Sequence, residues 1–193
     1  MILTYTNRKG VEHRVRAVKT KAGRERYVCT TKPDGPFLDR LPKGYEIHEG
    51  PNGRVSVRRK QQSRFTAEEV RAVKAGMKEF SSLKPYEYKI AAEKDAITVH
   101  LICQDLPRLV SMLNPAMARN AKAMENLAAK LGYYEPMMRF RLVDGKQRTF
   151  RAERFCSLGG IDDWIFIGQD GPLTSLVAEY VRHLGQESFY ELD

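Results

Sequence analysis

The chain has 193 residues, of which 42% are hydrophobic and 30% charged, and its formal net charge is +9. This composition is typical of a folded chain with one domain, or one domain and a smaller module, and excludes intrinsic disorder. No apolar run approaches the roughly 20 residues that span a bilayer. The start MILTYTNRKG lacks the pattern of a signal peptide, so we expect a cytoplasmic protein.

The positive charge is confined to one part of the chain. Residues 1–60 hold 15 Lys and Arg against 6 Asp and Glu, a net of +9, whereas residues 61–193 hold 18 of each kind. Such a partition indicates a dedicated electrostatic surface, and a polyanion is its expected partner. We therefore expect two parts, a basic β-rich module at 1–60 and an α+β domain at 61–193.

Residues 1–60 are predicted to form short strands separated by turns. Lys21-Ala22-Gly23 is a three-residue hairpin connection in which the glycine can take a positive φ. Gly50-Pro51-Asn52-Gly53 is the turn of a second hairpin. A small twisted sheet or partial barrel of four or five strands is expected. The predicted strands are 11–20, 24–31, 45–49 and 54–59.

The middle of the chain alternates between helical and strand patterns. Thr66 followed by Glu69 is a capping box, which predicts a helix that ends near Ser81 or Ser82. Asp105 is expected to cap a short helix that extends to Leu113. Three further elements are predicted: strands at 86–92 and 96–102 that form a hairpin, and one long helix that begins after Asn114 and ends at Gly132. A helix is the alternative for 86–92, because this segment is rich in alanine.

The end of the chain adds a hairpin, a strand and a helix. Asp144-Gly145-Lys146 is a strong turn signal between two strands. Apolar density predicts that 163–168 is a buried strand. Hairpins mixed with helices favour the α+β class rather than alternating βαβ units. The remaining predicted elements are strands at 137–143 and 147–155 and a helix at about 173–184 with Leu176, Val177, Tyr180 and Leu184 facing inward.

Stretches near both ends of the sequence resemble known sequences. Near the start they are KTKAGRERYV and GYEIHEGPNGRVSVRR, and near the end RFRLVD, GGIDDWIFIG and HLGQESFYEL. They are similar to a family of uncharacterised bacterial proteins. The resemblance implies an intracellular bacterial protein in which both parts occur together, and it implies no activity, ligand or catalytic residue.

The basic strands are the main candidate site. If 11–20 and 24–31 pair, Arg14 and Arg16 project from one face and Val15 from the other. Guanidinium groups bind phosphate with a planar fork, and a row of them can follow a nucleic-acid backbone without reading its sequence. The alternative is a solvated strand face whose charge prevents edge-to-edge aggregation. The expected nucleic-acid-binding residues are Arg14, Arg16, Lys19, Lys21, Arg24, Arg26, Arg54 and Arg58.

Two further groups of side chains belong to this hypothesis or compete with it. Tyr5, Tyr27 and Tyr45 have rings that can stack on unpaired bases, and the alternative is that they belong to the core.

A second basic cluster lies on the hairpin at 137–155, where a salt-bridged outer sheet face is the favoured interpretation. Its cations are Arg139, Arg141, Arg148, Arg151 and Arg154, diluted by Glu135, Asp144 and Glu153.

Catalytic and metal sites have little support in the sequence. The four histidines lack ligand spacing, and the three cysteines lie far apart, as expected for free thiols in a reducing compartment. We expect no metal, cofactor or catalytic residue. The weak candidates are Glu46 with His48, the nuclease-like Glu87-Tyr88-Lys89 with Asp34, and the adjacent carboxylates Asp162 and Asp163.

The leading hypothesis is a nucleic-acid-binding protein with little sequence preference that uses the basic module. The first alternative is a protein-interaction module whose basic face binds an acidic protein. The second alternative is a nuclease or another phosphoester-handling enzyme, which requires acids and a base that converge in a pocket.

Overall fold

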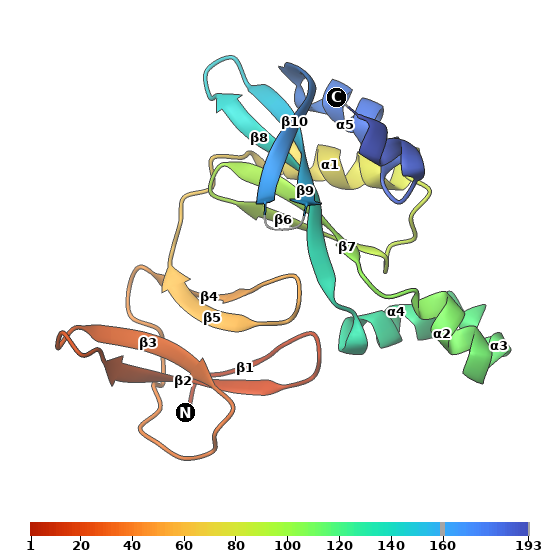
Figure 1. The fold of residues 1–193 in the computed structure, drawn as a ribbon. Coiled ribbons are helices and arrows are strands. Elements are labelled where there is room, and N and C mark those ends of the chain that lie inside the picture. Colours follow the sequence, from red (N-terminus) through yellow and green to blue (C-terminus); the bar gives the residue numbers. More distant parts are fainter. Residues whose placement is uncertain (159–160, 193) are drawn as a thin grey trace. The chain divides into compact units, whose positions relative to one another are not determined.

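The computed structural model describes residues 1–158 and 161–192 (Figure 1). The chain divides into two compact units, one formed by 1–61 with 129–131 and the other by 62–128 with 132–193. The described residues contain antiparallel sheets and helices, so the predicted α+β class is confirmed. In the part of the chain that is described, no helix is long and apolar enough to cross a membrane.

The first unit contains a three-stranded and a two-stranded antiparallel sheet. In the larger sheet the order is β1-β2-β3, and β4 pairs only with β5 among the described strands. The predicted strands are all present, and β1 is an addition to them. The bounds are β1 (Thr4–Thr6), β2 (Glu12–Lys19), β3 (Glu25–Thr30), β4 (Tyr45–Glu49) and β5 (Val55–Arg59).

Both predicted hairpin turns of this unit are confirmed. Gly23 has a φ of +73°, and the amide of Thr20 donates a hydrogen bond of 2.8 Å to the carbonyl of Arg24. Gly53 has a φ of +75° in the turn between β4 and β5. In these conformations a β-carbon clashes with the backbone, so glycine is the residue that fits.

The two sheets of the first unit are held together by polar contacts and one aromatic pair. Tyr27 of β3 and Tyr45 of β4 meet edge to face with ring centroids 4.8 Å apart. Glu49 of β4 accepts hydrogen bonds from the hydroxyl of Tyr5, at 2.8 Å, and from the amide of Arg8, at 3.1 Å. In β2 the side chain of Val15 is fully buried.

The second unit is a five-stranded antiparallel sheet in the order β10-β9-β8-β7-β6, with helices on one face. The capping box predicted for α1 (Ala67–Phe80) is present with both of its hydrogen bonds, and its C-cap is Ser81. The helix α5 (Leu173–Tyr180) packs against α1. The strands are β6 (Tyr88–Glu93), β7 (Ala96–Ile102), β8 (Tyr134–Asp144), β9 (Thr149–Leu158) and β10 (Ile161–Pro172).

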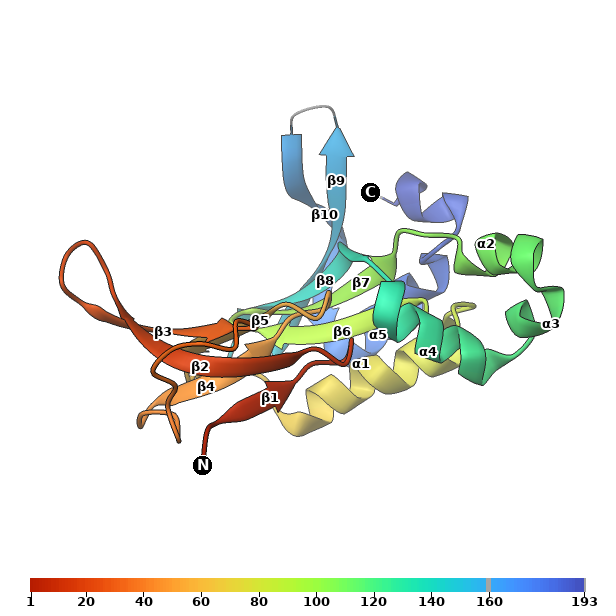
Figure 2. The same cartoon turned by 90° about the horizontal axis from the view of Figure 1, so that it is seen from below.

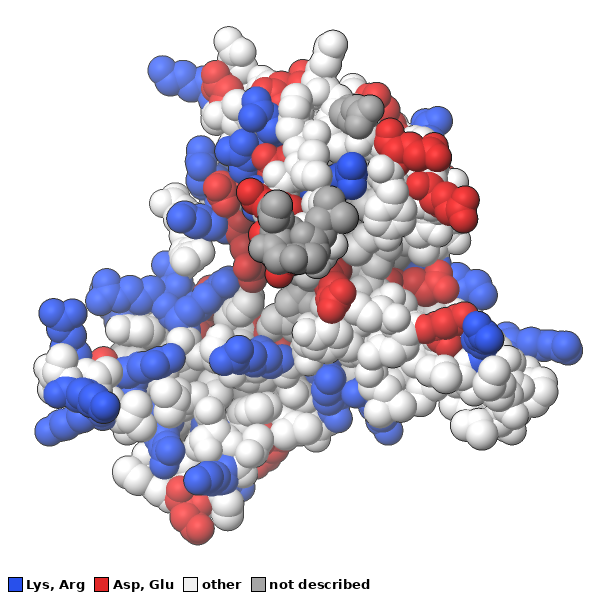
Figure 3. All heavy atoms as spheres, viewed as in Figure 1, with Lys and Arg blue, Asp and Glu red and all other residues white. Residues whose placement is uncertain are grey.

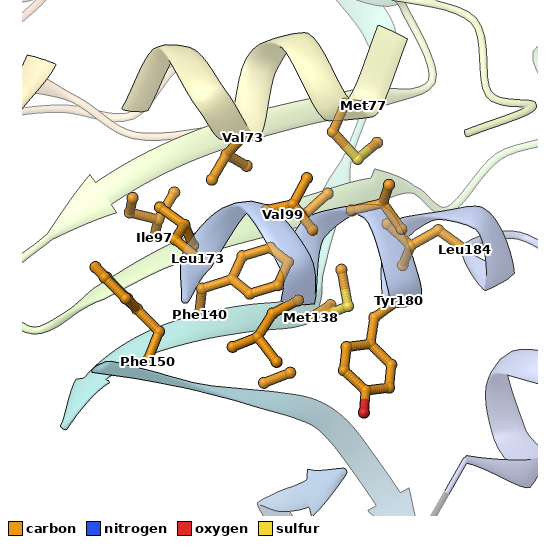
Figure 4. Close-up of a cluster of buried hydrophobic side chains, with 14 of the residues drawn as sticks. Val73, Met77, Ile97, Val99, Met138, Phe140, Phe150, Leu173, Tyr180 and Leu184 are labelled. Atoms are coloured by element: carbon orange, nitrogen blue, oxygen red, sulfur yellow. The ribbon is translucent and has the colours of Figure 1, made fainter. Parts of the chain in front are cut away.

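The main core lies between these two helices and the sheet (Figure 4). Register pairs Ile97 with Phe140, Phe140 with Ala152, and Ala152 with Ile167, so four strands contribute to one buried row. All four side chains have an exposed fraction of 0%. The predicted inward residues of the last helix, Leu176, Val177, Tyr180 and Leu184, are all buried.

The long helix predicted after Asn114 is wrong, because the chain forms two helices there. Asn114 caps α3 (Pro115–Ala118), and Asn120 then caps α4 (Ala121–Leu131) by accepting a 3.0 Å hydrogen bond from Ala123 N. An asparagine side chain competes for backbone amides, which favours a new helix start over a continuous helix. The short helix predicted after Asp105 is confirmed as α2 (Leu106–Leu113).

The expectation that 163–168 is a buried strand is also wrong. These residues lie within β10, which pairs with β9 on one side and stands at the edge of the sheet. Ile167 points into the core, but Ile165 and Phe166 keep exposed fractions of 37% and 42%. Ile167 is therefore the one buried residue of 163–168, and apolar density did not indicate burial here. The last predicted helix ends sooner than expected, because α5 stops at Tyr180 and a 3₁₀ turn follows at Val181–His183.

Candidate nucleic-acid interface

The eight cations expected to bind nucleic acid do not form one surface. In the first unit they fall into three groups: two arginines in the middle of β2, four cations at the tip of the β2–β3 hairpin, and two arginines on the β4–β5 hairpin. The groups differ in burial and in their partners. They are Arg14 with Arg16, then Lys19, Lys21, Arg24 and Arg26, then Arg54 with Arg58.

The first group holds a loop. Nη1 of Arg14 donates a 3.1 Å hydrogen bond to the carbonyl of Pro33, Nη2 pairs with Glu12 at 3.2 Å, and the guanidinium lies 5.5 Å from the ring centroid of Phe37. Arg16 forms a β-bridge with Phe37, and its Nε is buried without a hydrogen-bond partner. These two arginines share one face, as predicted, but that face packs under residues of the 31–44 loop.

The third group lies on the other sheet of the unit. Arg58 is the cross-strand partner of Glu46, and its Nε is 2.9 Å from the carboxylate. The side chain of Arg54 is exposed in the turn that precedes β5. The pairing of Arg58 reduces the positive charge of this hairpin, so the third group adds little to a phosphate-binding surface.

The side chains of the second group form no ion pair with a carboxylate in the described residues. All residues from Lys19 to Arg26 are exposed, so this stretch of the hairpin is solvated on both faces. Figure 2 shows its turn standing clear of β4 and β5. The only carboxylate here is that of Glu25, which accepts a 2.8 Å hydrogen bond from the hydroxyl of Tyr27.

Two cations that the sequence analysis did not select lie at the same end of the unit. Arg59 is the cross-strand partner of Tyr45, whose ring contacts Tyr27 of β3, and the amide of Lys60 donates a hydrogen bond of 2.8 Å to Gly44. Both side chains are exposed. The sequence run Arg58-Arg59-Lys60 indicated that cations gather here. The contact that brings them near the hairpin tip, between Tyr45 and Tyr27, joins residues that are far apart in the chain. We call the combined cluster the basic end; it consists of Lys19, Lys21, Arg24, Arg26, Arg59 and Lys60.

The basic end is exposed and electrostatically uncompensated. Within residues 1–158 and 161–192, none of its six side chains forms an ion pair with a carboxylate, whereas Arg8, Arg14 and Arg58 of the same unit each do. Figure 3 shows Lys and Arg gathered around the tip of the β2–β3 hairpin and the end of β5. Uncompensated cations on a solvated surface raise the local potential and attract anions.

The tyrosines proposed for base stacking are engaged inside the first unit. The hydroxyl of Tyr5 hydrogen-bonds to Glu49, and this bond, with smaller effects of burial and of the carboxylate charge, raises its pKa. Tyr27 and Tyr45 contact each other through their rings. Their alternative role, as part of the packing between the two sheets, is the one that the contacts support.

The second basic cluster is a salt-bridged sheet face, as predicted. Glu153 is 5% exposed and binds the Nε atoms of Arg139 and Arg141, the latter at 2.9 Å. Arg151 forms two hydrogen bonds with Asp170, at 2.7 and 2.8 Å, and these hydrogen bonds hold the pKa of that carboxyl below its usual range. The remaining members also have partners: Arg148 binds Glu69, and Arg154 donates to the carbonyl of Leu192.

The described part of the chain contains no group of three or more His, Cys, Asp or Glu residues able to hold a metal ion. Glu87 of the nuclease-like motif accepts a 2.7 Å hydrogen bond from the amide of Lys84, as a turn cap does. Asp162 accepts from the hydroxyl of Ser157, and Asp163 from the amide of Trp164. A depression of about 490 Å³ beside Arg148 is lined by charged groups that already have partners: Arg148 pairs with Glu69 inside it, and Asp170 pairs with Arg151.

Comparison with protein-family models, with curated proteins and with solved structures found no match to this chain. The geometry of the basic end is therefore the main ground for a functional assignment.

Proposed function

We propose that the first unit binds nucleic acid through the basic end, mostly by contacts to phosphates and with little sequence preference. One observation carries this proposal: six exposed cations without internal carboxylate partners gather at one end of the unit. Binding of a phosphate there breaks no internal ion pair. Each captured phosphate also releases condensed counterions, which is the main source of non-specific affinity.

The composition of the hairpin tip favours a phosphate backbone over an acidic protein. Protein interfaces bury an apolar centre and surround it with polar groups. From Lys19 to Arg26 the largest apolar side chain is that of Ala22. A surface of this kind offers charge and hydrogen-bond donors but no hydrophobic anchor.

The same unit favours duplex over single-stranded nucleic acid. Proteins that bind single strands stack bases on aromatic rings, and Tyr5, Tyr27 and Tyr45 are occupied by internal contacts. A two-stranded ribbon fits the major groove of B-form DNA, which is about 12 Å wide. The tip of the β2–β3 hairpin is such a ribbon, solvated on both faces and basic along its length.

The test is the affinity of the full chain for a fluorescently labelled duplex, measured by anisotropy over a series of salt concentrations. Six captured phosphates give a log–log slope of roughly −5. In a variant with Lys19, Lys21, Arg24 and Arg26 replaced by alanine, the slope should fall to about −2, because each lost phosphate contact removes about 0.9.

A matched control removes the same charge from the other unit. Alanine at the exposed residues Lys74, Lys78, Lys122 and Lys146 should leave the slope of duplex binding nearly unchanged. The proposal fails if the full chain does not bind at low salt, if binding ignores salt, or if the two variants weaken binding equally. Equal affinity for polyglutamate would favour the acidic-protein alternative, and Mg²⁺-dependent cleavage of the duplex would favour the nuclease alternative.

We also infer a cytoplasmic location for this activity. Cys29, Cys103 and Cys156 are free thiols in the structure. Burial raises the pKa of Cys29 and Cys103, which keeps both in the protonated and less reactive form. Free thiols of this kind are typical of reducing compartments. A thiol titration of the protein purified under native conditions tests this inference, with three reactive groups expected after unfolding and a disulfide contradicting it.

A further inference from the structure

The helix α2 is apolar on two sides. Leu106 and Val110 are buried at 4% and 7% in a small cluster with Met124 and Ala128 of α4. Beside them, Leu109, Met112 and Leu113 keep exposed fractions of 53%, 69% and 89%. Spacings of three and four residues place these three on one flank of the helix. We call them the α2 stripe.

The fold does not require the α2 stripe. Single exposed apolar residues are normal on protein surfaces, but a stripe of three on an eight-residue helix is a concentrated patch. A side chain that stays 89% exposed, as that of Leu113 does, gains almost no free energy from burial. A helix that is apolar on most of its circumference is typically covered. The α2 stripe therefore fits a contact outside this chain.

Two cations near the α2 stripe lack a carboxylate partner. From Asp105 to Glu125 the sequence contains Arg108, Arg119 and Lys122 together with the acidic residues Asp105 and Glu125. Asp105 caps α2 by accepting a hydrogen bond from the amide of Arg108, and Glu125 pairs with Lys122 at 3.8 Å. Arg108 and Arg119 are exposed, and neither forms an ion pair with a carboxylate in the described residues. In Figure 3 the surface over α2 and α3 is mostly white. The patch is thus an apolar surface with two unpaired cations near it.

We propose that the α2 stripe docks an amphipathic segment of another protein, whose apolar side chains are flanked by Asp or Glu. Apolar anchors at helical spacing recognise the stripe, and the carboxylates pair with Arg108 and Arg119. A second copy of this chain fits less well, because symmetric contact brings the same cations together. Met112 adds an adaptable contact surface, since its side chain is flexible and polarizable. This site is independent of the basic end.

The test uses the full chain and a designed probe. The probe is a fluorescein-labelled helical peptide of about 18 residues, or five turns, with a leucine stripe flanked by glutamates. We expect binding with a dissociation constant of about 10 μM or tighter. Replacement of Leu109, Met112 and Leu113 by serine should weaken binding at least tenfold, and these exposed positions allow the variant to fold. Arg108→Glu should weaken binding threefold or more.

Matched controls separate the α2 stripe from general effects. Val143→Ser changes an apolar residue that is 43% exposed on β8, and Lys74→Glu reverses an exposed charge on α1; both should bind the peptide like the unmodified chain. The proposal is overturned if the peptide does not bind at 100 μM (about tenfold above the expected constant), or if the serine variant binds equally. It is also overturned if a lysine-flanked peptide binds better, if the stripe instead mediates dimerisation in sedimentation experiments, or if it binds anionic phospholipid vesicles in place of the peptide.

Discussion

Replacement of Gly76 by alanine tests the packing of α1 against α5. Gly76 is buried in the middle of α1, and an added methyl group would overlap Cγ1 of Val177 in α5. The same methyl would lie 3.5 Å from Cβ of Val177 and 3.6 Å from Cδ2 of Phe80. The two helices must move apart to make room, because both belong to a closely packed core.

The expected magnitude follows from two opposing effects. Overpacking of a core costs about 1–3 kcal/mol. Alanine in place of glycine inside a helix recovers about 1 kcal/mol of helix propensity. We expect Gly76→Ala to lower the free energy of unfolding by up to about 2 kcal/mol, and the melting temperature of a chain of this size by up to about 8 °C.

The assay is thermal unfolding followed by circular dichroism, with two comparison variants. Ala75→Gly changes an exposed position of α1, so it reports helix propensity alone and should cost about 1 kcal/mol. Val177→Ala removes the overlapping Cγ1, and the double variant should cost at least about 1 kcal/mol less than the sum of the two single changes. If Gly76→Ala raises the melting temperature, the residue does not face Val177 and the described packing is incorrect.

Three further changes have defined outcomes. Thr66→Ala removes the capping box of α1 and should cost about 1 kcal/mol in urea unfolding; an unchanged midpoint would contradict the role of the cap. Burial raises the pKa of Glu49, but hydrogen bonds from Arg8 and Tyr5 outweigh it and hold the pKa below its ordinary value of 4.5. Its stabilising effect is therefore complete above about pH 4.5 and is lost as the pH falls through the lower, folded-state pKa. Glu49→Gln should cost roughly 1–3 kcal/mol at pH 7 and flatten the loss of stability in acid, and an equally steep acid transition would refute the assignment. At Gly23 an added β-carbon meets no atom within 4 Å, but Gly23→Val must adopt a φ of +73°, so a strain cost of about 1–2 kcal/mol is expected in thermal unfolding.

Local chemistry in the sequence predicted most elements. The Thr66 capping box, the Asp105 cap and the glycine of the Lys21-Ala22-Gly23 turn each act within a few residues, and all three are present in the structure. The break between α3 and α4 at Asn120, which was not predicted, also had a local signal, because asparagine is a strong N-cap residue. The burial of 163–168 was not predictable in this way, because apolar density does not reveal how many neighbours a strand has.

The candidate site was only partly accessible from the sequence for the same reason. The four cations at the hairpin tip follow from the turn signal, since a tight turn exposes its neighbours. The internal roles of Arg14 and Arg58 depend on Pro33 and Glu46, which approach through a returning loop and a cross-strand register. Such tertiary contacts decide whether a cation is available to a ligand, and no local pattern records them.

The attachment of the first strand has a consequence for synthesis of the chain. The amide of Leu3 donates to the carbonyl of Leu38, Asn7 donates to Gly53, and Arg8 donates to Gly50 and Pro51. During translation the contacts of Asn7 and Arg8, which follow β1, are therefore completed only when a segment some forty positions downstream has been made, a delay of a few seconds at ribosomal speeds of about 5–20 residues per second. Until then the donors of Asn7 and Arg8 form their hydrogen bonds with water.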